Sequence, residues 1–125
     1  SILITDCGSM SVHSAQTQAK LQIMMQYIHD NYSGPITLDD IARTVLISKS
    51  SVLNIFRTYL HTSPINYVVE YRLKRASKLL VDTENSVCAI AQETGFENIG
   101  YFCRRFKKLY GVTPIYYRNH CHSAE

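Results

Sequence analysis

The chain has 125 residues, of which 46% are hydrophobic; this composition excludes a disordered segment and allows one small domain with a buried core. Its formal net charge is +3, from 13 Lys and Arg residues against 10 Asp and Glu. Every basic residue except Lys20 follows residue 40, and such a concentration of positive charge is typical of a surface that faces phosphates. A solvated helix face would produce the same asymmetry.

Cysteine usage and hydropathy indicate the compartment. The four cysteines form no C-x-x-C pair, and we expect free thiols in a reducing cytoplasm because an adequate core needs no disulfides; they are Cys7, Cys88, Cys103 and Cys121. No apolar run approaches about 18 residues and no secretory signal is present, so we expect a cytoplasmic protein without a membrane span. The chain starts at Ser1 and not at Met, which is typical of a fragment of a longer protein. If the natural protein has an upstream ligand-binding or dimerisation region, most of that region is expected to lie outside this chain.

In chain order, residues 1–15 are small and polar and are expected to form a linker or the remnant of an upstream region. Apolar residues then recur three and four positions apart, which predicts a first helix over 17–32 that ends at Gly34-Pro35. Its buried stripe should consist of Leu21, Met24, Met25 and Ile28. Nowhere do apolar and polar residues alternate as they would in a strand.

Thr37 and Asp40 have the spacing of a capping box, which predicts a short second helix over 38–45. Ser48 is expected to cap a third helix that extends to about residue 60. The residues of this helix that should face inward are Val52, Ile55, Phe56 and Tyr59.

Ser63-Pro64 is typical of a helix start, and the long helix that it opens over 64–80 would be a rod of roughly 25 Å. Two capped helices follow over 87–93 and 99–110, and a last one runs from Thr113-Pro114 to about residue 119. The caps and the glycines that end the two middle helices are Ser86 with Gly95 and Asn98 with Gly111. The predicted fold is therefore all-α with seven helices.

The chain contains an internal repeat, in which a short helix, a tight turn and a longer helix are followed by a capped proline. Ile41-Ala42 returns 49 residues later as Ile90-Ala91, and Phe56 returns 50 residues later as Phe106. This arrangement predicts two helix-turn-helix units. We therefore divide the chain into a first subdomain over 16–62, a connecting helix over 63–81, a second subdomain over 82–120 and a tail over 121–125.

Basic side chains stand on the longer helix of each copy. They are Lys49 and Arg57 in the first copy and Arg104, Arg105, Lys107 and Lys108 in the second. Cationic side chains that flank the exposed face of a helix can neutralise phosphates while base edges are read between them. The pattern favours DNA binding, although two helices packed on a third also occur in proteins without a nucleic-acid role.

Several motifs of the second copy stand together: Ala89-Ile-Ala-Gln-Glu-Thr-Gly-Phe96, Tyr101-Phe-Cys-Arg-Arg-Phe-Lys-Lys108, Gly111-Val-Thr-Pro114 and Tyr117-Arg118. They resemble the signature of the AraC/XylS family of bacterial transcription regulators. The first copy is similar to the upstream half of the same domain, at Ile41-Ala42, Ser48, Phe56-Arg57, Ser63-Pro64, Tyr67, Arg72-Leu73, Ala76 and Leu79-Leu80. The resemblance covers about residues 21–118.

This resemblance implies two subdomains joined by a long helix, with the third and sixth helices each inserted in a major groove on one face of the DNA. The two grooves would lie about one helical turn apart, so that a single copy reads a bipartite site. The resemblance also implies double-stranded DNA and RNA polymerase as partners, and activation as the usual mode of regulation.

Site residues follow from the resemblance by position. Base contacts would come from Lys49, Ser50, Leu53 and Asn54 in the first unit and from Ile99, Gly100, Cys103 and Arg104 in the second. Phosphate contacts would come from Arg57, Ser63, Tyr101, Lys107, Lys108 and Thr113, with amides contributing at the two capped helix starts. The second reading helix is poor in hydrogen-bonding side chains, so it should rely on thymine methyl contact, close backbone approach and Arg104. Tyr101 either contacts a phosphate or packs.

Two positions depart from the pattern. Leu46 stands where the second copy has Gly95, and His61 stands where it has Gly111. The first copy must therefore make both turns without a glycine, which concerns the local turn geometry and not the fold.

Other kinds of site have weaker signals. His120-Cys121-His122 lies in the tail without a second cluster, so we expect no metal site. No phosphate loop, nucleophile elbow or pair of carboxylates is present, so we expect neither an enzyme nor a cofactor. Two rivals to a DNA reader stay open: a helical protein-interaction module, and a thiol-responsive regulator that senses oxidants through Cys103.

Overall fold

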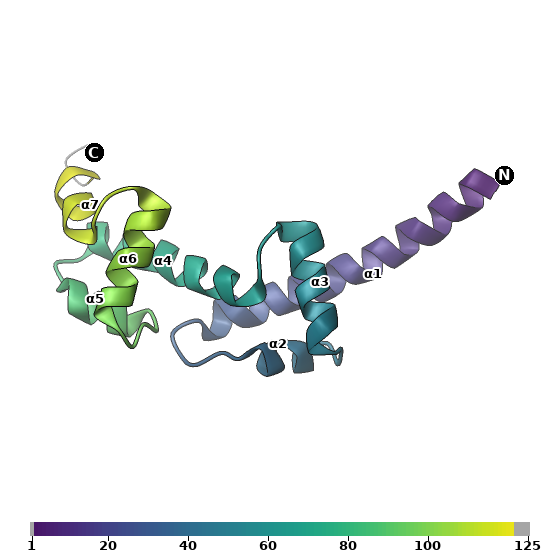
Figure 1. Cartoon of the computed structure of the whole chain (residues 1–125), viewed down its shortest axis with the longest axis horizontal. Helices are drawn as coiled ribbons and strands as arrows, with labels where there is room; N and C mark the ends of the chain where they lie inside the picture. Colours follow the sequence, from purple (N-terminus) through teal and green to yellow (C-terminus); the bar gives the residue numbers. More distant parts are fainter. Residues whose placement is uncertain (1, 122–125) are drawn as a thin grey trace. The chain divides into compact units, whose positions relative to one another are not determined.

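The computed structural model describes the backbone of residues 2–121 and the side chains of residues 15–120. This part of the chain forms seven α-helices and no strand (Figure 1), which confirms the predicted all-α fold. The helices are α1 (Ile2–Asn31), α2 (Leu38–Thr44), α3 (Lys49–Leu60), α4 (Pro64–Asp82), α5 (Val87–Glu93), α6 (Ile99–Tyr110) and α7 (Pro114–Cys121). The bounds of α5 and α6 are those predicted from their caps and stops.

The first helix begins much earlier than predicted, at Ile2 and not near Thr17. The serines and Gly8 in residues 1–15 are weak helix formers, and they favoured a linker for that reason. Extending a helix that is already nucleated requires no new nucleus, and even glycine costs only about 1 kcal/mol relative to alanine. These residues therefore continue α1, and their role as a link to an upstream region stays a prediction.

The chain divides into two compact units, each made from more than one stretch of sequence. Unit 1 consists of α1 up to Asp30 together with residues 36–65, and unit 2 consists of residues 31–35 together with the chain from Asn66 onward. The boundary inside α4 lies after Ile65, so nearly all of this helix belongs to unit 2. The loop of residues 31–35 also belongs to unit 2, although it follows a helix of unit 1.

Three helices build the core of unit 1. Their buried apolar side chains are Leu21, Met24 and Ile28 of α1, Ile41 and Ala42 of α2, and Val52 and Phe56 of α3. Three other positions that were predicted to face inward are half-buried: Met25, Ile55 and Tyr59. Each helix thus turns one apolar face to a shared core, which leaves the opposite face of α3 exposed to solvent.

The two turns of unit 1 that lack a glycine still adopt the left-handed conformation. Leu46 has a φ of 55° and His61 a φ of 56°, while Gly95 and Gly111 at the matching positions of unit 2 have φ values of 97° and 80°. For a residue with a Cβ atom this conformation costs roughly 1–2 kcal/mol. The Leu46 side chain is 89% exposed, so its burial does not offset this cost.

Aromatic side chains occupy the centre of the unit 2 core, which α4, α5 and α6 build. The ring centroids of Phe96 and Phe102 are 4.9 Å apart in an edge-to-face arrangement, and those of Phe102 and Phe106 are 5.8 Å apart. The other buried members of this core are Val69, Leu73, Ala76, Leu80, Ile90 and Ala91. The core fixes the rotation of α6 about its axis and so decides which of its side chains face solvent.

An arginine of α4 ties the loop of residues 31–35 into unit 2. Arg72 donates from Nε to the carbonyl oxygen of Tyr32 at 2.7 Å and from Nη2 to that of Gly34 at 2.8 Å. Burial lowers the pKa of the Arg72 guanidinium, and the two carbonyls replace part of the water that it loses. A Cβ added to Gly95 would lie 2.7 Å from the Tyr32 oxygen and 2.8 Å from Arg72 Nε, so space as well as φ requires glycine here.

Candidate nucleic-acid interface

The solvent-facing side of α3 carries the predicted contacts of the first unit. Ser48 begins the helix by accepting a hydrogen bond at Oγ from the Ser51 amide at 3.2 Å. Val52 and Phe56 anchor the buried side. The exposed side chains include all five residues that were predicted to meet DNA, namely Lys49, Ser50, Leu53, Asn54 and Arg57. This helix carries no acidic residue, so an approaching phosphate meets no like charge on it.

A shallow cleft in unit 1 lies between the middle of α3 and the turn that precedes α4. It is lined by Leu53, Arg57, His61, Thr62 and Ser63. The predicted phosphate contacts Arg57 and Ser63 therefore border the same depression, and both are exposed.

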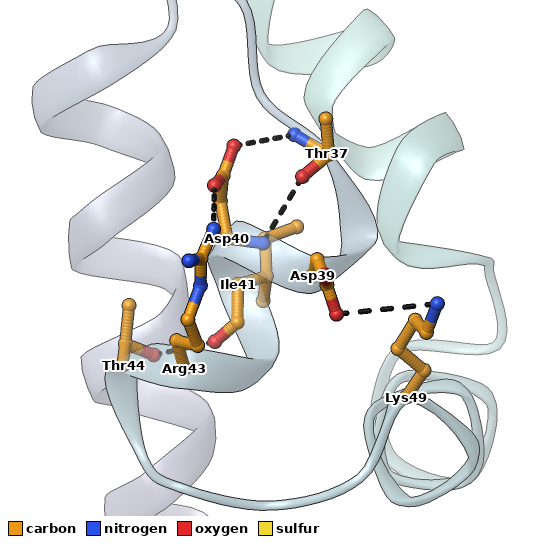
Figure 2. A network of polar contacts seen from close by, with 7 residues as sticks. All are labelled: Thr37, Asp39, Asp40, Ile41, Arg43, Thr44 and Lys49. Atoms are coloured by element: carbon orange, nitrogen blue, oxygen red, sulfur yellow. Dashed lines mark hydrogen bonds and ion pairs between the residues drawn. The ribbon is translucent and has the colours of Figure 1, made fainter.

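The first turn of α2 is held by the predicted capping box (Figure 2). The Thr37 amide donates to Oδ2 of Asp40 at 3.0 Å, and the Asp40 amide donates to Oγ1 of Thr37 at 3.1 Å. Arg43 also donates to Oδ1 of Asp40 at 2.7 Å. The hydrogen bond from the Thr37 amide is the main reason that the pKa of Asp40 lies below its usual value of 3.8. Asp40 is thus engaged within its own helix.

The neighbouring carboxylate, Asp39, faces the reading helix. Its Oδ1 lies 3.9 Å from Nζ of Lys49 across the turn between α2 and α3, and both side chains are more than half exposed (Figure 2). This pair was not predicted, because its members belong to different helices and an unusual left-handed turn lies between them. A residue predicted to contact a base therefore has an acidic neighbour within the protein.

The exposed side of α6 carries most of the predicted contacts of the second unit. Asn98 caps the helix by accepting from the Tyr101 amide at 2.9 Å. The exposed predicted residues are Ile99, Tyr101, Arg104, Lys107 and Lys108, and Gly100 and Cys103 are half-buried. Cys103 also packs against the hydrophobic core, so it is less available to a base than Arg104 at the next position.

Arg105 does not belong with the other basic residues of α6. Its place in the sequence groups it with Arg104, Lys107 and Lys108, but its guanidinium bonds the Tyr101 hydroxyl and the Asn66 side chain of α4. The buried side chains of Phe102 and Phe106 fix the orientation of α6 about its axis, and this orientation places Arg105 on the side that faces α4. The solvent-facing cationic group of α6 therefore consists of Arg104, Lys107 and Lys108.

Thr113 lies at the start of α7, as its sequence context predicted. Its Oγ1 accepts from the Tyr116 amide at 3.2 Å and its carbonyl from the Tyr117 amide at 2.9 Å, while Pro114 is buried. Pro114 has no N–H, so the Ile115 amide is the further donor that this first turn offers to an anion, beside the Thr113 hydroxyl of the predicted phosphate contact.

The described residues bear on two further features, a cluster of metal ligands and a helix that could span a membrane. No group of three His, Cys, Asp or Glu side chains among them has the arrangement of a metal site, and the tail residues Cys121 and His122 lie outside the described side chains. Cys88 and Cys103 are free thiols. None of the described helices combines the length and the hydropathy that a membrane span needs.

Comparisons with known proteins bear on these two reading helices. A family model described as a helix-turn-helix domain matches residues 41–120. The transcriptional regulator ArgR of Pseudomonas aeruginosa is 35% identical over 109 residues, which are 87% of this chain and 32% of that protein. The lactose operon transcription activator of Staphylococcus xylosus is 30% identical over 100 residues, covering 80% of this chain and 36% of that protein. The chain thus spans about a third of the length of these curated relatives.

A solved structure gives the same result at the level of the fold. An AraC-type DNA-binding domain-containing regulator from Chromobacterium violaceum is 32% identical and superposes with a TM-score of 0.79. The match covers 84% of this chain and 94% of that one, so it includes both helix-turn-helix copies.

Proposed function

Because the chain belongs to the AraC type of helix-turn-helix DNA-binding domains, we propose that it reads a bipartite duplex site with α3 and α6, each in a major groove. The observation that carries the proposal is common to both helices. Each buries two aromatic or branched side chains on one face and exposes an opposite face that holds basic residues and no acidic ones. Such a face suits a helix that lies against phosphates while its side chains reach base edges.

The exposed residues are proposed to divide into two roles. Base edges would be read by Lys49, Ser50, Leu53 and Asn54 of α3 and by Ile99, Gly100, Cys103 and Arg104 of α6. Phosphates would be bound by Arg57, Ser63, Tyr101, Lys107, Lys108 and Thr113. Exposure supports a contact role for these positions, since all of them except Cys103 lie outside the hydrophobic core. The division into roles is supported in the second unit by side-chain chemistry, because Arg104 alone of its base-reading set carries a forked donor for guanine.

In the whole protein, this domain is proposed to regulate transcription, with activation through RNA polymerase as the expected mode. We infer a binding role and not a catalytic one, on the nucleoid in the bacterial cytoplasm. An upstream ligand-binding or dimerisation domain would supply the signal, as expected for relatives that are more than twice as long as this chain.

The test is selection of binding sites from a random duplex library with the 125-residue chain, followed by affinity measurements between about 50 and 200 mM salt. The expected result is two short conserved blocks about 10 base pairs apart and a steep loss of affinity with salt. Binding that is insensitive to salt, with no enriched motif, would contradict the proposal and favour the protein-interaction module.

A further inference from the structure

Arg105 lies at the centre of a polar network inside unit 2. Its Nη1 donates to the Tyr101 hydroxyl at 3.0 Å, and its Nη2 donates to Oδ1 of Asn66 in a short hydrogen bond. The guanidinium carbon also lies 5.9 Å from the centroid of the Tyr101 ring. Its Nε is buried and has no hydrogen-bond partner among the described residues. A cation in the middle of a reading helix is therefore turned inward and fixed to another helix.

The far end of the network is fixed as well. Asn66 donates from Nδ2 to Oε2 of Glu70, one turn further along α4, at 3.1 Å. An amide whose nitrogen is engaged by a carboxylate presents its oxygen on the other side, which is where Arg105 donates. The order of contacts is Glu70, Asn66, Arg105, Tyr101, and it runs from α4 to the exposed side of α6.

This order determines what the Tyr101 hydroxyl can do. The oxygen accepts from a cationic donor, so its own proton points elsewhere and is polarised as a donor. Tyr101 is 38% exposed, and Arg104 follows it three positions later on α6, so the two residues are neighbours on one helix surface. An anionic acceptor that approaches α6 from solvent would meet this hydroxyl beside the groups proposed to bind DNA.

We propose that Arg105 is a positioning residue that presents the Tyr101 hydroxyl as a hydrogen-bond donor to a DNA phosphate while it fixes α6 against α4. The proposal rests on the proposed DNA-binding function and specifies one part of it. It also distinguishes Arg105 from Lys107 and Lys108: Arg105 acts through a neutral hydroxyl, whereas the two lysines would neutralise phosphates directly.

The test uses the duplex selected by the wild-type chain and compares Arg105→Gln, Tyr101→Phe and the double variant across the same salt range. We expect each single variant to lose about tenfold in affinity, because a hydrogen bond to a charged group is removed or misdirected. The salt slope should stay unchanged, since no ionic contact with the phosphate is lost. The double variant should bind no more weakly than the singles, since both changes disable the same hydroxyl.

Lys108→Gln is the matched control, because it removes one positive charge from an exposed position of the same helix. It should lower the salt slope by about one. A similar fall in the salt slope of Arg105→Gln would overturn the proposal in favour of a direct phosphate contact. The proposal would also be overturned if the single variants kept the wild-type affinity, or if the free-energy losses of the two single variants added up in the double variant. A wild-type chain that selects no site would instead refute the proposed function.

A second pair of variants keeps Arg105 and so covers the case in which Arg105→Gln unfolds the domain. Asn66→Ala releases one side of the guanidinium and Tyr101→Phe removes the hydroxyl on the other. If Arg105 connects the two residues, the double variant should lose less affinity than the product of the two single fold-losses. All variants are compared at a temperature well below their melting temperatures, so that each of them is folded in the assay. Losses that multiply would show that Asn66 does not act through the Tyr101 hydroxyl and would overturn the proposal.

Discussion

At the residue scale, the two copies place different residues at the same position of the turn between their two helices. Gly95 and Leu46 both have a positive φ, but Gly95 is confined by the Tyr32 carbonyl and Arg72, whereas Leu46 points into solvent. In unit 2 the surrounding atoms leave no space for a Cβ at this position, whereas in unit 1 a residue with a Cβ adopts the same left-handed conformation at a cost in backbone strain. Substitutions at the two positions should change stability in opposite directions.

Gly95→Ala is expected to lower the free energy of unfolding by at least about 2 kcal/mol, because the added Cβ combines a left-handed φ with a contact under 3 Å. Gly111→Ala is the control, since its φ is also positive but a Cβ there meets nothing within 4 Å; we expect a loss of about 1 kcal/mol. Leu46→Gly should stabilise by up to about 1 kcal/mol. Urea unfolding measures all three, and equal losses at the two glycines would contradict the steric argument.

A second residue-scale prediction concerns the acidic neighbour of Lys49. Asp39→Asn removes a negative charge that competes with DNA for the lysine and repels nearby phosphates, so affinity for any duplex should rise, by up to about fivefold at low salt and less at high salt. Asp82→Asn, an exposed carboxylate at the end of α4, makes the same change in net charge and should have a smaller effect. Equal gains in the two variants would show that only net charge matters.

At the element scale, local signals were enough to predict most helix bounds. Ser48, Ser86 and Asn98 all accept hydrogen bonds from amides three residues ahead, and such caps can be recognised in a sequence because both partners lie within one turn. The same holds for the exposed sides of α3 and α6, which follow from the spacing of their buried residues. Most of the candidate interface was therefore predictable by position.

What could not be predicted depends on partners far away in the sequence. Arg105 was assigned to the basic face because its partner Asn66 is 39 residues distant, and nothing local marks the pair. The docking of residues 31–35 depends on Arg72, 40 residues after Tyr32. The early start of α1 was missed for a different reason, since weak helix formers still extend an existing helix.

Two substitutions on α6 should separate its two roles. Arg104→Ala is expected to cost roughly 1–3 kcal/mol on the selected site and to relax specificity at one base step, because a forked donor to a base edge is lost. Lys107→Ala should weaken selected and random duplexes alike and lower the salt slope by about one. Competition binding measures the loss of affinity of each variant for the selected and for the random duplex. If Arg104→Ala weakens both duplexes equally, Arg104 contacts a phosphate and not a base.

At the scale of the whole molecule, the remaining rival is a helical module that binds a protein. Reversing the charges of two exposed α6 residues in the variant Arg104→Glu, Lys107→Glu should abolish duplex binding, because two attractions to phosphates become repulsions. Circular dichroism should show an unchanged helix content, since both side chains are exposed. Duplex binding that survives this double reversal would exclude α6 from the interface.

The path of the chain between the two units limits how such a protein can be divided. It enters unit 2 at Asn31, returns to unit 1 at Ile36 and leaves it again after Ile65, so each unit is built from two separate stretches of the sequence. A gene segment that begins at Asn66 would omit residues 31–35 and leave Arg72 without the two carbonyls to which it donates. Any single cut between residues 30 and 66 therefore divides the sequence of at least one unit between two fragments, so neither fragment holds a complete pair of units or a complete set of their contacts.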